Sequence, residues 1–236
     1  MNVSVFDWLA NLPFVYVLLI AVVLYALQAL ILRSQGIPEG TRRWLGESVE
    51  SLLFAWVVVF VLLKPFFIQA FYIPSESMVP TLQVRDRLLV AKFPYWIRGP
   101  QRGEIMVFKA PPNADRDGVE RDYIKRTIGL PGERLEVREG RVWINGKALT
   151  EPYIQEPADD PFGPIIVPDG HYFMMGDNRN SSADSRYWGP LARERIVGKA
   201  WLRFWPLDKL GFLAKPAYEA IPEQPQPAVG IPALMH

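Results

Sequence analysis

Two long apolar runs near the N-terminus limit what this 236-residue chain can fold into more than any other feature. The first run, residues 14–32, holds 19 residues without a charge, enough for a helix to cross the hydrocarbon core of a membrane. No basic residue precedes the run and no small-residue cleavage pattern follows it, so it lacks the pattern of a removable signal peptide. We expect a first transmembrane helix over residues 14–32, after a short segment at residues 1–13.

The second run covers residues 52–73. Its uncharged part, residues 52–63, has only 12 residues, and residues 64–73 extend it to 22 with one lysine and one proline. We predict a second transmembrane helix over residues 52–73. Its lysine, Lys64, should reach toward a membrane interface rich in aromatic side chains. These are Phe66, Phe67, Phe71 and Tyr72. A buried or interfacial helix is the alternative, and the all-round hydrophobicity of the run disfavours it.

The basic residues near the two runs predict their orientation. Residues 1–12 and 74–84 contain no Lys or Arg, whereas residues 33–51 contain Arg33, Arg42 and Arg43. Loops enriched in Lys and Arg stay in the cytoplasm. We therefore expect residues 33–51 to form a cytoplasmic loop, and both termini to face outward.

The chain after residue 74 is predicted to be an outer domain of short strands. Residues 134–138 alternate between apolar and polar side chains, residues 141–145 repeat this spacing with Val142 and Ile144, and Glu139-Gly140 separates them, which predicts a β-hairpin. Many such runs and no long helical period favour a mainly β, antiparallel, barrel-like domain over residues 74–215. The Pro-rich residues 216–236 are expected to be a disordered tail.

Composition excludes several kinds of function. The net charge of +1 gives no electrostatic reason to expect nucleic-acid binding. The absence of cysteine excludes disulfides, thiolate catalysis and cysteine-ligated zinc. With only His171 and His236, a multi-histidine metal site is disfavoured, and we expect no metal or cofactor.

Two serines directly after the second run are candidate nucleophiles. Ser75 and Ser77 lie between Pro74 and Pro80, a pattern that also fits an ordinary turn. A serine needs a base, and the internal histidine, His171, precedes an apolar strand where a local structural role is favoured over a Ser-His-Asp triad. The other option is a lysine whose pKa is lowered by roughly 3 units, which desolvation is able to supply.

Lys125 is the candidate for that base. In the strand 123–127, Lys125 and Arg126 point to opposite faces, so one of them must point inward or into a cleft. A lysine is able to lose its charge there, whereas an arginine is not. The strand alone is equally compatible with a solvated Lys125. The polar stretch 176–189 fits a hydrogen-bonded turn, a calcium loop with mismatched spacing, or a shell that supports a neutral lysine.

Four segments, taken together and in order, resemble the conserved boxes of bacterial type I signal peptidases, which are serine proteases with a Ser–Lys dyad. These segments are Ser75–Leu82, Arg85–Lys92, Tyr123–Gly132 and Gly176–Gly189. Their position after two predicted membrane spans also matches that family, and the resemblance covers roughly residues 50–206.

The resemblance implies a role for each matching residue. Ser77 corresponds to the nucleophile, Lys125 to its general base, and Ser75 to the hydroxyl that completes the oxyanion hole with the Ser77 N–H. Ser182 corresponds to the serine that hydrogen-bonds the base, and Asp184 and Arg186 match a loop-stabilising pair. The pocket for the residue before the cleaved bond is expected to be lined by Ile73, Pro74, Met78, Leu82, Tyr123 and Ile124.

The implied activity is removal of signal peptides from exported preproteins, after a small residue in an Ala-x-Ala type site. The implied partners are signal peptides, the lipid bilayer and the protein export machinery. The implied location is the bacterial inner (cytoplasmic) membrane, multi-pass, with the catalytic domain on the periplasmic side. Two residues depart from the family pattern, because Glu76 replaces a small residue and Asn180 replaces a frequent Asp.

Two other functions are compatible with parts of the sequence. A Ser–Lys self-cleaving repressor would need a DNA-binding head, and residues 1–73 hold apolar spans instead. A non-catalytic, membrane-anchored β-domain that binds or scaffolds envelope proteins would tolerate conservative changes at Ser77 and Lys125.

Overall fold

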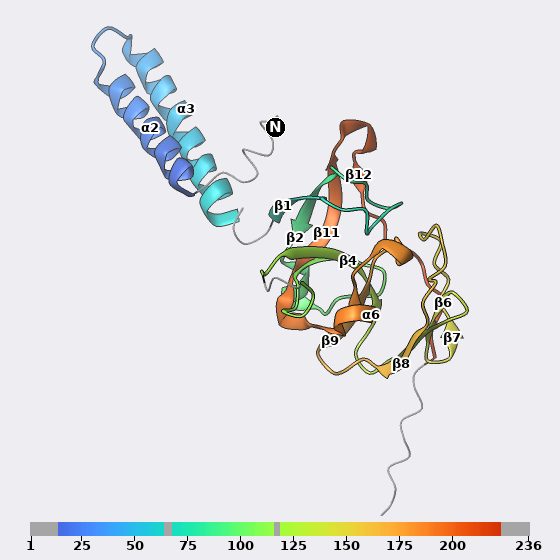
Figure 1. Cartoon of the computed structure of the whole chain (residues 1–236). Coiled ribbons are helices and arrows are strands. Elements are labelled where there is room, and N and C mark those ends of the chain that lie inside the picture. Colours follow the sequence, from blue (N-terminus) through green and yellow to red (C-terminus); the bar gives the residue numbers. More distant parts are fainter. Residues whose placement is uncertain (1–13, 64–67, 116–118, 223–236) are drawn as a thin grey trace, which may run out of the picture.

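The computed structural model describes residues 14–63, 68–115 and 119–222, and it begins with a helical hairpin (Figure 1). Helix α2 (Phe14–Arg33) lies antiparallel to α3 (Glu39–Val57), which continues into the π-helical segment η1 (Val58–Leu63). The Trp56 indole donates to the Val17 carbonyl at 3.1 Å, and Gly46 lets the Leu32 side chain approach. Most apolar side chains of the hairpin are exposed, such as Leu30 and Phe54. Both helices are long and apolar enough to cross a membrane.

The second helix differs from its predicted bounds of 52–73. It begins at Glu39, and Ile68–Tyr72 is the strand β1, which pairs with β2 (Arg87–Ala91). The prediction counted apolar residues only, so it missed the charged first turns of the helix. It also read a β-rich aromatic segment as helix, although that segment pairs with the next strand, β2. The expected interfacial residues Lys64, Phe66 and Phe67 lie outside the described residues.

The larger sheet has eight strands, and every pair in it is antiparallel. Its order is β1-β2-β11-β3-β4-β9-β10, with β12 also paired to β11. The strands not yet defined are β3 (Ile105–Lys109), β4 (Asp122–Gly129), β9 (His171–Met175), β10 (Leu191–Ala192), β11 (Ile196–Trp205) and β12 (Gly211–Phe212). The short helices beside it are α5 (Pro94–Ile97), η2 (Arg179–Ser181), α6 (Ser185–Trp188), η3 (Arg193–Arg195) and η4 (Leu207–Lys209).

The smaller sheet has four antiparallel strands in the order β7-β6-β5-β8. These strands are β5 (Arg134–Arg138), β6 (Arg141–Ile144), β7 (Lys147–Ala148) and β8 (Phe162–Ile166). The predicted hairpin is confirmed, because β5 pairs with β6 across Glu139 and Gly140, and both residues have positive φ. The mainly antiparallel fold behind two apolar helices is also confirmed. Within the described chain both sheets are open rather than a closed barrel.

A segment predicted to be disordered is in fact packed. Tyr218 and Ile221 lie against the core cluster of the smaller sheet, which is built around Leu135, Ile144 and Phe173. The prediction of a disordered tail over 216–236 is therefore wrong for residues 216–222, because its high proline content concealed two large apolar anchors. Residues 223–236 lie outside the described part of the chain.

Candidate active site

Ser77 lies on the loop between β1 and β2, the serine loop, which is anchored by residues of the core. The loop follows β1, and the Ile73 N–H donates to the Asp86 carbonyl at 2.9 Å. Met78 and Leu82 on the same loop are fully buried in a cluster with Ile73, and the Leu82 N–H donates to the Met78 carbonyl at 2.9 Å. This packing fixes the loop, and it leaves Ser77 only 6% exposed.

The structure brings Lys125 to Ser77. Lys125 lies on β4 opposite Met106 of β3, and its Nζ is 2.8 Å from the Ser77 Oγ. Its side chain is buried, and the Tyr123 ring centroid is 5.4 Å from Nζ. The Ser75 Oγ is 3.4 Å from the Ser77 Oγ, so three polar groups meet at one point. The 2.8 Å hydrogen bond between the Ser77 hydroxyl and the Lys125 amine is short enough for direct proton transfer.

The surroundings of Lys125 favour its neutral form. Burial lowers the pKa of Lys125 to about 8, although the carboxylates of Asp184 and Asp177 act in the opposite direction. A neutral amine is then available near neutral pH as an acceptor for the Ser77 proton. The pair therefore has the contact distance that a serine nucleophile with a lysine base requires, and the neutral fraction of the lysine grows as the pH rises toward 8.

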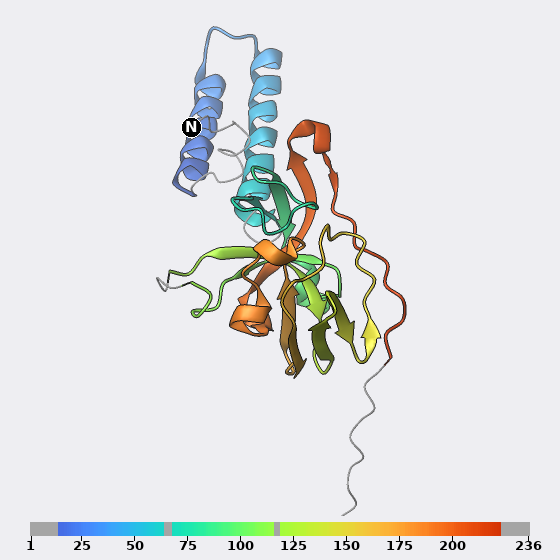
Figure 2. The same cartoon turned by 45° about the vertical axis from the view of Figure 1, so that its right-hand side comes forward.

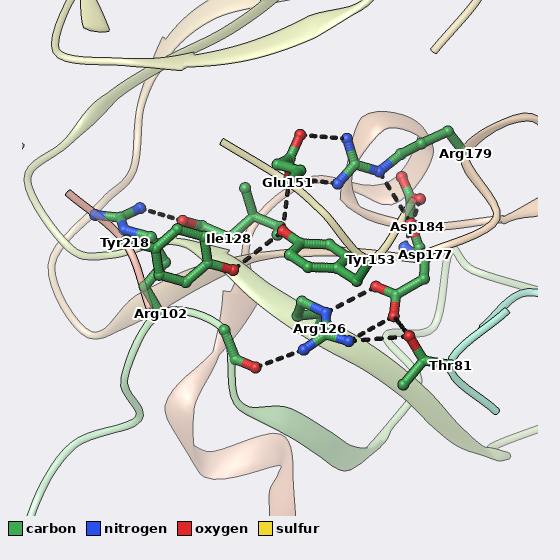
Figure 3. A network of polar contacts seen from close by, with 12 residues as sticks. Thr81, Arg102, Arg126, Ile128, Glu151, Tyr153, Asp177, Arg179, Asp184 and Tyr218 are labelled. Atoms are coloured by element: carbon green, nitrogen blue, oxygen red, sulfur yellow. Dashed lines mark hydrogen bonds and ion pairs between the residues drawn. The ribbon is translucent and has the colours of Figure 1, made fainter. Parts of the chain in front are cut away.

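Arg126, on the other face of β4, is also buried. Its guanidinium makes two hydrogen bonds to Asp177, at 2.8 and 2.6 Å, and a third to the Gly103 carbonyl at 2.8 Å (Figure 3). Strand alternation placed one of the two basic side chains inward, and the structure buries both because a second polar network lies behind the strand. Asp177 was not anticipated. It lies two residues beyond β9, and only the register of β9 against β4, which pairs Met175 with Arg126, brings it there.

The polar stretch 176–189 forms a backing for the serine loop. The Asn178 N–H donates to the Ser77 carbonyl at 3.1 Å, and Asp184 accepts from the Gly176 N–H at 3.1 Å. Arg186 Nε lies 2.9 Å from Asp184, so the two residues form an ion pair. Among the interpretations left open for this stretch, these contacts fit a hydrogen-bonded loop with an Asp184–Arg186 ion pair behind Ser77, and within the described chain none of its side chains hydrogen-bonds Lys125.

Ser182 and Gly176 are in close contact behind the dyad. A Cβ on Gly176 would clash with the Ser182 Oγ and with the Ser77 carbonyl oxygen. The Ser182 hydroxyl is buried and makes no hydrogen bond within the described chain, including none to Lys125. The structure thus places Ser182 next to the site without the hydrogen bond expected of it. The need for a glycine at position 176 was not anticipated either.

The two residues that depart from the family pattern take different positions. Glu76 is exposed, and its carbonyl accepts from the Asn178 amide at 3.3 Å. Asn180 accepts from the Asp159 N–H at 3.0 Å and donates to the Pro157 carbonyl at 3.1 Å. An Asp carboxylate lacks the donor that the second bond needs. Asn180 therefore holds a neighbouring loop and has no contact with the dyad.

A cleft of about 330 Å³ opens at the dyad. It is lined by Pro74, Ser75, Ser77, Arg121, Asp122, Tyr123, Ile124, Lys125, Ser181 and Ala183. Of the six predicted pocket residues, Pro74, Tyr123 and Ile124 line this cleft, whereas Ile73, Met78 and Leu82 lie in the core and are not in its lining. His171 is not in the lining, and its Nδ1 lies 2.9 Å from the Asp169 carbonyl oxygen.

Comparison with known proteins gives consistent matches. The family model described as signal peptidase, peptidase S26, matches residues 45–205. A probable signal peptidase I-2 from Synechocystis sp. is 43% identical over 190 residues, which cover 80% of this chain and 85% of that protein. A signal peptidase I from Leptolyngbya laminosa is 48% identical over 163 residues, 68% of this chain and 80% of the relative. A probable signal peptidase I-1 from Synechocystis sp. is 42% identical over 173 residues, with 72% and 88% covered.

Proposed function

This chain belongs to the signal peptidase family, peptidase S26, and on that premise we propose that it cleaves signal peptides with Ser77 as nucleophile and Lys125 as general base. The observation that carries the proposal is the 2.8 Å contact between the Ser77 Oγ and the Lys125 Nζ inside a cleft. Membership of the family supplies the reaction, which is hydrolysis of a peptide bond in an exported preprotein.

The reaction proceeds in two halves. Neutral Lys125 takes the proton of the Ser77 hydroxyl as the Ser77 Oγ attacks the carbonyl carbon before the cleaved bond. The tetrahedral intermediate collapses, the C–N bond breaks, and protonated Lys125 gives its proton to the leaving amine. Water then attacks the acyl-enzyme with Lys125 again as base, which frees the signal peptide and restores Ser77.

Ser75 completes the oxyanion hole in this proposal. Its hydroxyl lines the cleft and lies 3.4 Å from the Ser77 Oγ, so it is close to where the carbonyl oxygen of a bound substrate would be. The second donor is the Ser77 backbone N–H. Donors fixed before the reaction stabilise the developing negative charge without reorganising.

The cleft supports specificity for a small residue before the cleaved bond. Ile73, Met78 and Leu82 are buried in the core outside the cleft lining, while Tyr123 and Ile124 are part of that lining. We expect a small side chain such as that of alanine to be bound beside Tyr123 and Ile124. We expect the peptide to bind in an extended form, with backbone pairing for affinity and this part of the cleft for specificity.

The helical hairpin places the site at a membrane in this proposal. Both helices have the length and composition of membrane spans, and the arginines Arg33, Arg42 and Arg43 lie at the ends of the helices next to the turn. The β-domain then lies on the periplasmic side of the inner membrane. There the lipid-held signal peptide of a preprotein, delivered by the export machinery, reaches the cleft by diffusion in two dimensions.

Cleavage of a preprotein with an Ala-x-Ala site tests the dyad. We expect Ser77→Ala and Lys125→Met each to lower kcat/KM by at least about 10³-fold, because either change removes a group that the chemical step requires. Lys209→Met is the matched control, since Lys209 is exposed on η4 and should not affect the rate. Wild-type cleavage by either dyad variant would refute the mechanism and favour a non-catalytic, membrane-anchored domain.

A further inference from the structure

The last described segment of the chain, residues 213–222, crosses the β-domain as a strap. Figure 2 shows it in dark red, running from the β11–β12 hairpin along one side of the domain to the smaller sheet. Polar contacts hold it along its length. The Leu213 N–H donates to the Trp201 carbonyl at 2.8 Å, Lys147 donates to the Ala220 carbonyl at 3.0 Å, and Asn145 donates to the Pro222 carbonyl at 2.8 Å.

Tyr218 is the strap residue whose side chain reaches a polar network inside the domain. Its ring lies over Gly103, where an added Cβ would come within 2.7 Å of the ring and where φ is +84°. The Tyr218 hydroxyl lies 3.1 Å from the Tyr153 hydroxyl, and Tyr153 donates to Glu151 at 2.7 Å (Figure 3). Burial raises the pKa of both tyrosines, so both hydroxyls keep their protons and act as donors.

Tyr153 connects the strap to the catalytic strand. Its ring centroid lies 4.0 Å from the Arg126 guanidinium carbon, which is a close cation–π contact in a buried site (Figure 3). Arg126 directly follows Lys125 on β4 and holds Asp177 by two hydrogen bonds. The ring of Tyr153 thus packs against the flat face of the Arg126 guanidinium, while the N–H groups at the edge of the guanidinium donate to Asp177.

A second route from Tyr153 ends at the same place. Glu151, which accepts from Tyr153, is paired with Arg179 at 2.9 Å, and Arg179 Nε donates to the Gly176 carbonyl at 3.1 Å. Both routes therefore meet at Gly176 and Asp177. These two residues begin the loop that contacts the Ser77 carbonyl through Asn178.

We propose that Tyr218 and Tyr153 are positioning residues for the Ser77–Lys125 dyad, because they hold Arg126 against Asp177 directly behind it. The proposal rests on the proposed function, since it assigns these residues a role in that reaction. Arg126 neutralises the Asp177 carboxylate, and Asp177 is one of the two carboxylates that act on Lys125. The strap therefore limits how strongly Asp177 favours a protonated, inactive lysine.

The direction of the expected effect follows from the charges around the two basic residues. Asp177 and Asp184 from the polar loop, Ser77 from the serine loop and Tyr123 from β4 surround Lys125. Asp177, Tyr153 and Tyr218 surround Arg126. When Arg126 is held less firmly, less of the Asp177 charge is neutralised, and the pKa of Lys125 rises. More lysine is then protonated at neutral pH, and cleavage there slows.

The test is the pH dependence of kcat/KM for an Ala-x-Ala substrate, measured with the full chain in detergent. For Tyr153→Leu, which removes the ring beneath Arg126, we expect the acid limb to move to higher pH by about 0.5–1 unit. The rate at pH 7 should fall roughly three- to tenfold, and the rate at high pH should approach that of the wild type. Tyr218→Phe removes one hydroxyl only, and should shift the limb in the same direction by less.

Tyr95→Phe is the matched control. It removes a hydroxyl that lies 3.0 Å from Glu104, away from the cleft lining, so it should lower thermal stability about as much as Tyr218→Phe without moving the acid limb. An unmoved limb in folded Tyr153→Leu would overturn the proposal. If Tyr153→Leu does not fold, Tyr218→Phe becomes the deciding variant. An acid limb of Tyr218→Phe at the same pH as that of Tyr95→Phe would then overturn the proposal. The proposed function fails separately, if Ser77→Ala still cleaves.

Discussion

At the scale of single residues, the burial that lowers the pKa of Lys125 also destabilises the fold. Burial lowers its pKa from 10.5 to about 8, so the folded protein binds a proton at this site less strongly than the unfolded chain does. One unit of pKa corresponds to about 1.4 kcal/mol, so holding the charged form inside costs roughly 3 kcal/mol below pH 8. The cost decreases between pH 8 and 10.5 and disappears above that range, where lysine is neutral in both states.

Lys125→Met is therefore expected to be inactive and yet more stable than the wild type. The variant replaces a buried cation with an apolar side chain of similar length, so the free energy of unfolding at pH 6 should rise by about 1–3 kcal/mol. The difference should shrink as pH approaches 10. Thermal or urea unfolding at both pH values measures it. A variant less stable than the wild type at pH 6 would mean that the lysine is not destabilised by its surroundings.

At the scale of elements, the polar loop after β9 and the serine loop are packed without room for a side chain between them. Gly176 contacts the Ser77 backbone on one side and Ser182 on the other. This contact fixes the spacing between the Ser77 backbone and the loop after β9. It is a backbone contact, so the neighbouring chain is not able to move aside as a flexible side chain would.

Gly176→Ala should displace the serine loop. We expect a loss of roughly 10²-fold in kcat/KM and a destabilisation of about 1–3 kcal/mol, since overpacking forces the backbone to shift. Gly211→Ala on β12 is the control, because a Cβ there meets no atom within 4 Å. Equal activity of the two variants would show that the close approach at Gly176 is not needed for catalysis.

What was predictable at this scale depended on whether a pattern is local. The β5–β6 hairpin is encoded by residues adjacent in the sequence, which are the two strands and the Glu139-Gly140 turn between them. It was predicted correctly. The pairing of Arg126 with Asp177 depends on the register of β4 against β9. The alternation of side chains within one strand does not predict its register against another strand. The local sequence made Ser77 and Lys125 candidates among alternatives, and the resemblance of whole segments to a family singled them out as a pair. The strap was missed because composition conceals the two side chains that anchor it.

At the scale of the whole molecule, a helical hairpin and a β-domain are joined within a few residues. In both overall views the hairpin projects away from the β-domain, on the side of β1 (Figures 1 and 2). β1 leads from the end of the second helix directly to the serine loop. An enzyme built in this way would keep its nucleophile a short distance from the membrane in which its substrate is held.

Cysteine labelling tests the proposed topology, because the chain has no cysteine of its own. Gly36→Cys in the turn between the helices should react with a membrane-impermeant maleimide only after the cells are permeabilised. Asp208→Cys, exposed in the β11–β12 hairpin, should react in intact spheroplasts. The reverse pattern would place the β-domain in the cytoplasm and remove it from the signal peptides of exported proteins.

The central claim is that neutral Lys125 activates Ser77, and the pH dependence of kcat/KM for an Ala-x-Ala peptide tests it most directly. The lysine must lose its proton before it acts as a base, so the rate should rise with pH through an ionisation near pH 8. Below that pH the rate should fall about tenfold for each unit, as the protonated fraction grows. A free-enzyme profile with no ionisation between about pH 6 and 9 would contradict the account.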